Sequence, residues 1–157
     1  MFVGLLFVGL GSACGLPPAS VLPPVESLHG FAMEARGHTF AGLAAVSVGP
    51  RPWQLDVLMP TGNSLFSVQV GDEVQVQAGM PELEEVLARI PFERDLALLY
   101  RYRCEGSRCR AGRWRLVAQG EGWSLRGPGG RATLVRQGQL LVLHDPRRGY
   151  TMRVHAP

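Results

Sequence analysis

The chain has 157 residues, which is enough for one domain with a substantial core. Apolar residues make up 46% of it and charged residues 18%, a balance that excludes a disordered chain and a chain embedded wholly in a membrane. All 16 basic residues are arginine, but the formal net charge is only +3, which is too small to indicate nucleic-acid binding.

The chain begins with an apolar stretch that leads to a single cysteine. Residues 2–10, FVGLLFVGL, are too few to span a bilayer, which needs about 20 residues. Small residues follow and precede Cys14, as in a secretory signal peptide that ends in a bacterial lipobox. We therefore expect a signal peptide over residues 1–13 and a covalent diacylglycerol with an N-acyl chain, such as palmitate, on Cys14. The alternatives are an ordinary signal peptide with an incidental cysteine, or a buried N-terminal strand.

A proline-rich segment follows this cysteine. GLPPASVLPP contains two Pro-Pro pairs, which exclude a helix and a central strand. We expect residues 14–26 to be the lipidated cysteine and an extended tether, with the folded domain over residues 27–157. Gly15 rather than an aspartate follows Cys14, which favours the periplasmic face of the outer membrane over the inner membrane.

The body of the chain predicts strands, then helices, then strands again. Between residues 27 and 78, apolar residues alternate with polar ones in five stretches that are separated by turn residues. Residues 80–90 and 92–103 carry the apolar spacing of amphipathic helices, with Pro81 in the first turn of the former. Four or five further strands are expected over residues 112–157. The order predicts a mainly β (α+β) fold, a curved antiparallel sheet that forms an incomplete barrel with two helices covering its concave side.

The two remaining cysteines, Cys104 and Cys109, lie in the short stretch RCEGSRC. An even pair in an exported chain predicts a disulfide, and a zinc half-site is the alternative, although no second pair of ligands lies nearby. Six arginines gather over residues 101–115. They are either a solvated surface or a basic lip for anionic lipid headgroups, for which we expect contacts from Arg101, Arg103, Arg113 and Arg115.

This order of elements resembles the LolA/LolB superfamily of bacterial lipoprotein carriers and receptors, and LolB-like outer-membrane lipoproteins in particular. The resemblance is carried by the lipobox cysteine and tether, LHGFAMEARG, the turn DVLMPTG and the helical stretch IPFERDLALLY. It implies an unclosed barrel whose hydrophobic cavity holds acyl chains. The receptors expose an apolar residue in a strand–strand turn, whereas the matching turn here has the polar Thr61.

The apolar stripes are either a filled core or the wall of such a cavity. The residues that we expect to line the cavity are Trp53, Leu55, Val57, Met59, Phe66, Val68, Leu83, Leu87, Leu96, Leu99 and Trp114.

No catalytic or metal-binding motif accompanies these features. The four histidines belong to no recognisable motif, and neighbours such as His144 and Asp145 would point to opposite faces of a strand. We therefore expect a monomeric, non-enzymatic, lipid-anchored protein without metal or nucleic acid, which binds acyl chains of lipoproteins or phospholipids and aids their localisation to the outer membrane. The alternative is an envelope scaffold or interaction lipoprotein with a filled core.

Overall fold

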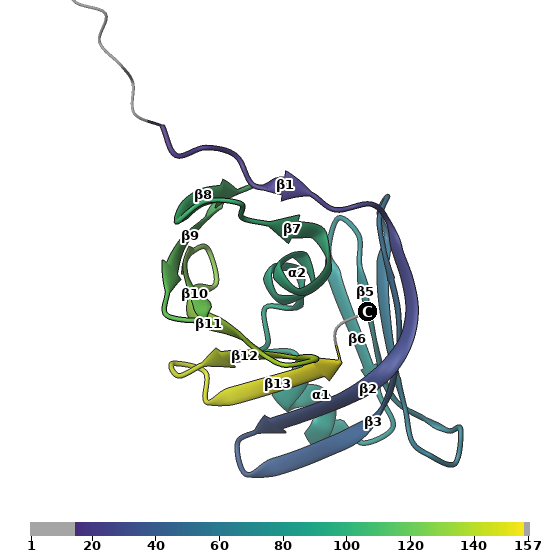
Figure 1. Ribbon diagram of the computed structural model, residues 1–157. Coiled ribbons are helices and arrows are strands. Elements are labelled where there is room, and N and C mark those ends of the chain that lie inside the picture. The colour runs from purple at the N-terminus through teal and green to yellow at the C-terminus, as the bar shows by residue number, and fades with distance from the viewer. Residues whose placement is uncertain (1–14, 156–157) are drawn as a thin grey trace, which may run out of the picture.

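The computed structural model describes residues 15–155, most of which form one strongly curved antiparallel sheet of eleven strands. The strand order is β6-β5-β4-β3-β2-β13-β12-β11-β10-β9-β8, so the two halves of the chain join where β2 pairs with β13. Figure 1 shows the sheet curling around the helix α2 (Phe92–Leu96). The edge strands β6 and β8 do not pair with each other, so the barrel stays open. The predicted fold class is confirmed.

Most strands are short, and the longest two, β2 and β3, form one hairpin with a tight turn at Arg36 and Gly37. Both turn residues have positive φ (49° and 81°), which suits the right-handed twist of a two-residue hairpin. The strands of the large sheet are β2 (Val25–Ala35), β3 (His38–Val48), β4 (Trp53–Leu58), β5 (Ser64–Val70), β6 (Val74–Ala78), β8 (Arg108–Ala111), β9 (Trp114–Gln119), β10 (Gly122–Gly127), β11 (Gly130–Gln137), β12 (Leu140–Asp145) and β13 (Tyr150–His155).

Two glycines permit the sharp curvature of the sheet. A Cβ on Gly42 would lie 2.1 Å from the carbonyl oxygen of Leu58, and one on Gly122 would lie 2.4 Å from that of Leu134. Neither backbone could approach so closely if a larger residue stood there. The close approaches bring β3 against β4 and β10 against β11.

The helices α1 (Pro81–Leu87) and α2 lie where the apolar spacing predicts them. Pro81 starts α1, and its buried stripe contains Leu83 and Leu87. The second predicted helix is shorter than expected, because α2 passes into the π-helical turn η1 (Ala97–Arg101), and the chain then becomes extended. The reason is a tertiary partner, since β7 (Tyr102–Arg103) pairs with β1 (Ser20–Val21). No helix of residues 15–155 is long and apolar enough to cross a bilayer.

One half of the curve is filled by packed side chains. Phe66 of β5 lies between Phe31 of β2 and Phe92 of α2, with ring centroids 6.0 Å and 6.3 Å away. Such edge-on and tilted contacts between aromatic rings stabilise a core beyond the burial of their area. They fix α2 against the strands β2 and β5.

The N-terminal segment is docked rather than free. Ala19 donates its backbone N–H to the carbonyl of Arg110 (2.7 Å), and the N–H of Arg110 donates to the carbonyl of Pro17 (2.8 Å). The segment thereby covers the edge of β8, a strand that lies in the predicted cysteine loop. The chain is extended as expected for residues 15–24, but β2 already begins at Val25.

Candidate functional site

A cavity of about 210 Å³ lies between η1 and the strands β9–β12. A cavity of roughly 150 Å³ with an apolar lining stays dry and accepts a benzene ring, so this space admits a somewhat larger apolar group. The side chains that line it from the helix and the sheet include Leu98, Leu99, Leu116, Trp123, Leu134 and Leu141.

The alternation of the strands explains this lining. On β12, Leu141 lines the cavity, and Leu143, two residues further, is buried in the core. Leu140 and Val142 point to the other face of the sheet, because successive side chains alternate. On β11, Leu134 pairs with Trp123 of β10, so both reach the same side. One face of four neighbouring strands therefore becomes an apolar wall.

The N-terminal segment forms the opposite wall. Leu22 and Val25 line the cavity together with Tyr102 of β7. The N–H of Leu22 donates to the carbonyl of Arg101 (2.8 Å), and the Arg101 Nη1 donates to the carbonyl of Leu22 (3.1 Å). Leu22 lies outside the large sheet, so we expect this part of the enclosure to open more readily than the central strands.

The exposed side chains of the lining are charged. Arg103 and Arg136 contribute two guanidinium groups, and Glu121 contributes one carboxylate. An apolar space with a small number of polar groups at its rim is typical of a small-molecule site. The excess of guanidinium groups favours a ligand that has an apolar body and an anionic end.

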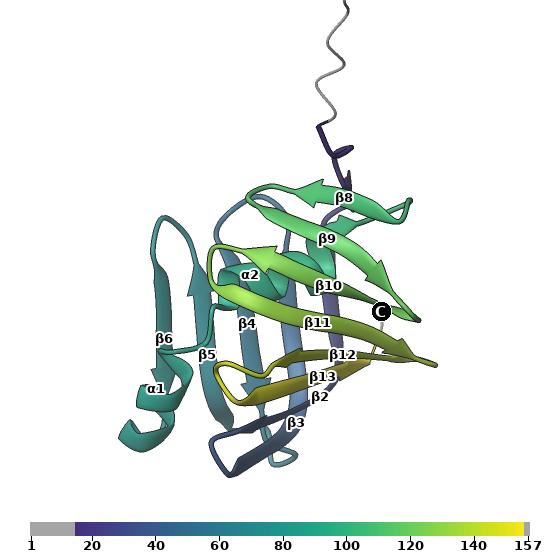
Figure 2. The same cartoon turned by 90° about the vertical axis from the view of Figure 1, so that its left-hand side faces the viewer.

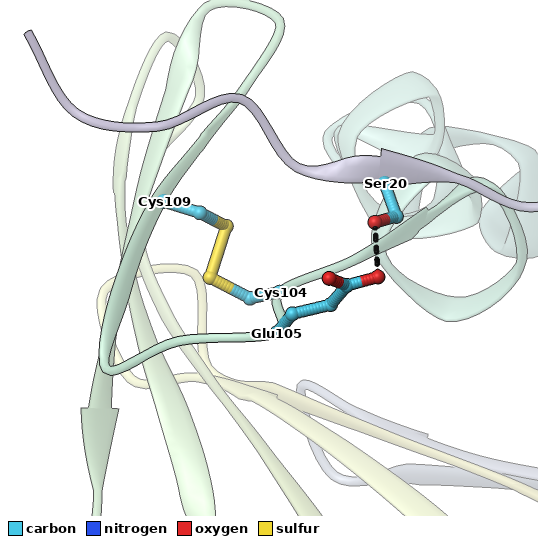
Figure 3. Close-up of a disulfide and its surroundings, with 4 residues drawn as sticks. All are labelled: Ser20, Cys104, Glu105 and Cys109. Carbon is cyan, nitrogen blue, oxygen red and sulfur yellow. Dashed lines mark hydrogen bonds between the residues drawn. A yellow bond between two sulfur atoms is a disulfide. The ribbon is translucent and has the colours of Figure 1, made fainter.

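The Cys104–Cys109 disulfide fixes the loop beside this cavity, with the two Cα atoms 5.7 Å apart (Figure 3). Cys104 belongs to the cavity lining, and Cys109 of β8 is buried. Glu105 in the same loop accepts a hydrogen bond from the Ser20 hydroxyl (2.7 Å), as Figure 3 shows. The loop therefore ties the N-terminal segment to β7 and β8. The predicted disulfide is confirmed.

A polar pair lies behind the apolar wall. Tyr100 belongs to the cavity lining. Its hydroxyl is 2.7 Å from Nε2 of His29, and the two rings stack with centroids 5.6 Å apart. Burial lowers the pKa of His29, and burial raises the pKa of Tyr100. In the described chain, Nδ1 of His29 and Oγ of Ser27 are buried without a hydrogen-bond partner. The sequence analysis did not single out this pair.

The structure places most of the predicted lining residues in the filled core instead. Phe66 of β5 packs against Phe92 of α2, and Met59 is only half-buried. Of the predicted set, Leu99 lines the cavity described above. The buried core members are Trp53, Leu55, Val57, Phe66, Val68, Leu83, Leu87, Leu96 and Trp114.

The four arginines predicted to meet headgroups do not share one surface. Arg101 is half-buried and bonded to Leu22, and Arg103 lies at the cavity rim. Arg113 is 3.8 Å from a carboxylate oxygen of Glu93, whereas Arg115 is exposed on the outer face of β9. A basic lip made of these residues together is therefore not formed.

A buried ionic cluster was missed by the sequence analysis. Nη1 of Arg94 donates to Asp145 (3.0 Å), its Nε donates to Asp95 (2.8 Å), and its Nη2 donates to the Tyr150 hydroxyl (2.6 Å). Burial raises the pKa of Asp95 to about 6. Arg94, Asp95 and Asp145 are almost fully buried. The available signal was the run of three charged residues, ERD, inside the otherwise apolar stretch IPFERDLALLY.

The remaining predicted features lie apart from the cavity or outside the described residues. Cys14 lies outside the described residues. His144 is exposed and 2.9 Å from the Thr151 hydroxyl, whereas Asp145 points inward, so the two do not orient each other. Between residues 15 and 155, no three His, Cys, Asp or Glu side chains are grouped as metal ligands would be.

Comparisons of the chain with protein-family models, with curated proteins and with solved structures each find no match.

Proposed function

We propose that this protein is a non-enzymatic, lipid-anchored envelope protein that binds an acyl chain of a lipoprotein or phospholipid. The observation that carries the proposal is the apolar cavity between η1 and β9–β12, with Arg103 and Arg136 at its rim. An acyl chain buried there would gain about 25 cal/mol for each Å² of apolar surface removed from water. The phosphate or carboxylate of the same ligand would meet the guanidinium groups.

The anchor and the address belong to the same proposal. The sequence GSAC at residues 11–14 supports lipidation of Cys14, and the order of elements resembles LolB-like outer-membrane lipoproteins. We place the protein on the periplasmic face of the outer membrane, where it would aid the localisation of lipoproteins or lipids. The cavity is smaller than a typical ligand pocket of about 300–1,000 Å³, so a long chain must displace the N-terminal wall.

The test is the binding of a fluorescent long-chain fatty acid to the purified chain with Cys14 replaced by serine. Leu141→Trp places a larger side chain into the cavity and should weaken binding at least about tenfold, which corresponds to about 1.4 kcal/mol. Leu140→Trp is the matched control. The side chain of Leu140 lies on the other face of β12 from Leu141, so this substitution should leave the affinity unchanged. No binding by the parent chain, or equal losses in both variants, would contradict the proposal.

A second candidate function is an interaction module, which the outer face of β2 and β3 favours. Leu28 and Leu43 are exposed there to 64% and 43%, and they are diagonal neighbours, because Leu28 pairs with Ala45 and Gly30 with Leu43. Exposed apolar patches often mark protein–protein contacts. This candidate predicts that Leu43→Ser abolishes capture of a partner from envelope extracts, whereas Leu141→Trp does not affect it.

A further inference from the structure

The outer face of β8–β11 carries a row of arginines that runs across four neighbouring strands. Arg110 pairs with Arg115, Arg115 with Arg126, and Arg126 with Arg131. Arg108 lies two residues from Arg110 on the same face of β8. All five side chains are exposed, and we call them the arginine row.

The arginine row has no counter-charge among residues 15–155. In the part of the chain that the structure describes, none of its members forms an ion pair. The Nε of Arg110 donates to the carbonyl of Gly112 (3.0 Å), which leaves its charge unopposed. The neighbouring outward-facing residues are uncharged, such as Val117, Ser124 and Thr133.

Like charges directly opposite on adjacent strands destabilise a sheet. The sequence repeats this unfavourable pairing at each of the three strand junctions of the row. A surface that is strained by repulsion in the free protein gains when an anionic partner neutralises it. An extended anionic surface suits the row, since its members lie along the outer face of the sheet and Arg108, Arg115 and Arg126 line an open depression there.

The path of the N-terminal segment indicates which anionic partner this is. Pro18 pairs with Arg110, and Leu16 lies in a shallow depression with Arg108, Arg115 and Arg126. Figure 2 shows the chain leaving the domain beside β8. The sequence that precedes this point is the apolar stretch over residues 2–10 and Cys14. The apolar stretch and Cys14 therefore precede, in the sequence, a segment that lies against the arginine row.

We propose that the arginine row is a docking surface for the anionic headgroups of a lipid bilayer, and that it holds the domain in a fixed orientation on the membrane. The row acts together with the N-terminal segment, because two membrane signals bind far more stably than one. In this orientation β8–β11 face the membrane. The inference concerns the outer face of the sheet and does not depend on the cavity.

The test uses the full chain with Cys14→Ser, mixed with vesicles of phosphatidylcholine alone or with added phosphatidylglycerol. The triple variant R115Q/R126Q/R131Q should lose about 100-fold in affinity for the anionic vesicles, since each arginine near such a surface contributes about a fivefold factor. The matched control R36Q/R89Q/R147Q removes the same charge at another basic group, around α1 and the β2–β3 and β12–β13 turns. It should retain most of the affinity.

Three further readouts separate the outcomes. High salt should abolish the preference for anionic vesicles, because the charges are exposed and screened. The row variant should unfold at the same or a higher temperature than the parent, since repulsion between neighbouring strands is removed. Leu141→Trp should bind anionic vesicles like the parent, which separates this inference from acyl binding. Equal losses of affinity for anionic vesicles in the two triple variants would overturn the proposal. Equal binding of the parent to both kinds of vesicle would also overturn it, as expected if the row binds an acidic protein instead.

Discussion

His29 lies in a buried environment that its position in the sequence did not indicate. It lies on the inner face of β2, with Nε2 at the Tyr100 hydroxyl and Nδ1 buried without a partner in the described chain. Protonation would place a charge in an apolar setting, next to the charge of His155 when that residue is protonated. Burial is therefore the main reason that its pKa falls below 6.5, and His155 adds to the effect.

This lowered pKa makes stability depend on pH with a definite sign. Below pH 6.5 the unfolded chain takes up a proton at His29 before the folded chain does, so the free energy of unfolding falls as the pH falls towards the folded-state pKa. His29→Gln keeps a hydrogen-bond partner for Tyr100 and removes the titration. Urea unfolding between pH 8 and pH 5 should show that the parent loses stability relative to this variant below about pH 6.5.

The buried Asp95 contributes with the opposite sign. Its folded-state pKa of about 6 exceeds the ordinary value of 3.8, so its contribution to stability decreases as the pH rises through this window. This contribution is common to the parent and to His29→Gln, and it cancels in their difference. A difference that stays constant from pH 8 to pH 5 would contradict the assignment of the buried, neutral imidazole.

At the scale of the elements, the buried ionic cluster joins α2 to the β12–β13 hairpin. Arg94 and Asp95 come from α2, whereas Asp145 and Tyr150 flank the hairpin turn. Asp145 also accepts hydrogen bonds from the backbone N–H groups of Arg147 and Arg148, at 3.1 Å and 3.0 Å. One carboxylate thus shapes the turn and fixes the guanidinium of the helix.

We predict that Asp145→Ala lowers the free energy of unfolding by about 3–5 kcal/mol, because it leaves the Arg94 charge buried and only partly compensated. The matched control is Glu34→Ala, which breaks the exposed ion pair with Arg153 and should cost at most about 1 kcal/mol. Urea unfolding measures both. If the two substitutions cost the same, the cluster does not hold α2 against the hairpin.

The sequence predicted those elements whose residues carry their own pattern. The alternation in WQLDVL and the spacing of Leu83 and Leu87 lead to β4 and α1 without knowledge of the rest of the chain. It did not predict β7, β8 or the docking of the N-terminal segment. These elements are two to four residues long. β7 exists because Val21 meets Tyr102 across the fold, whereas β8 pairs with β9 in a short hairpin and meets Pro18 on its other side.

The position of the cavity was beyond sequence reasoning for a related cause. The apolar inner face of a strand looks the same in the sequence whether it meets a helix or an empty space, so neither Leu55 nor Leu141 reveals its surroundings. In the structure Leu55 is buried in the core, whereas Leu141 lines the cavity. The arginine row was equally hidden, since Arg110, Arg115, Arg126 and Arg131 become neighbours only through strand register.

Considered as a whole, the molecule has one core beneath its curved sheet, with a cavity of about 210 Å³ beside it. Phe92 and Leu96 belong to the filled core, whereas the cavity lies between β9–β12, η1 and the extended segment before β2. The extended segment lies outside the large sheet, and we expect it to open at a lower free energy than the central strands. If Cys14 carries the proposed lipid, this segment physically links the anchor to the cavity wall.

Hydrogen exchange tests this division at the level of the whole molecule. The amides of Ala19 and Leu22, which donate to Arg110 and Arg101, should exchange through local opening, whereas those of β4, between β3 and β5, should require global unfolding. A long-chain fatty acid should speed exchange at Ala19 and Leu22, because the ligand exceeds the volume of about 210 Å³ and displaces the segment. Exchange at β4 should slow or stay unchanged, since bound ligand stabilises the fold. If Ala19, Leu22 and β4 all exchanged at one rate, with and without fatty acid, the segment would be an integral part of the core and would provide no route into the cavity.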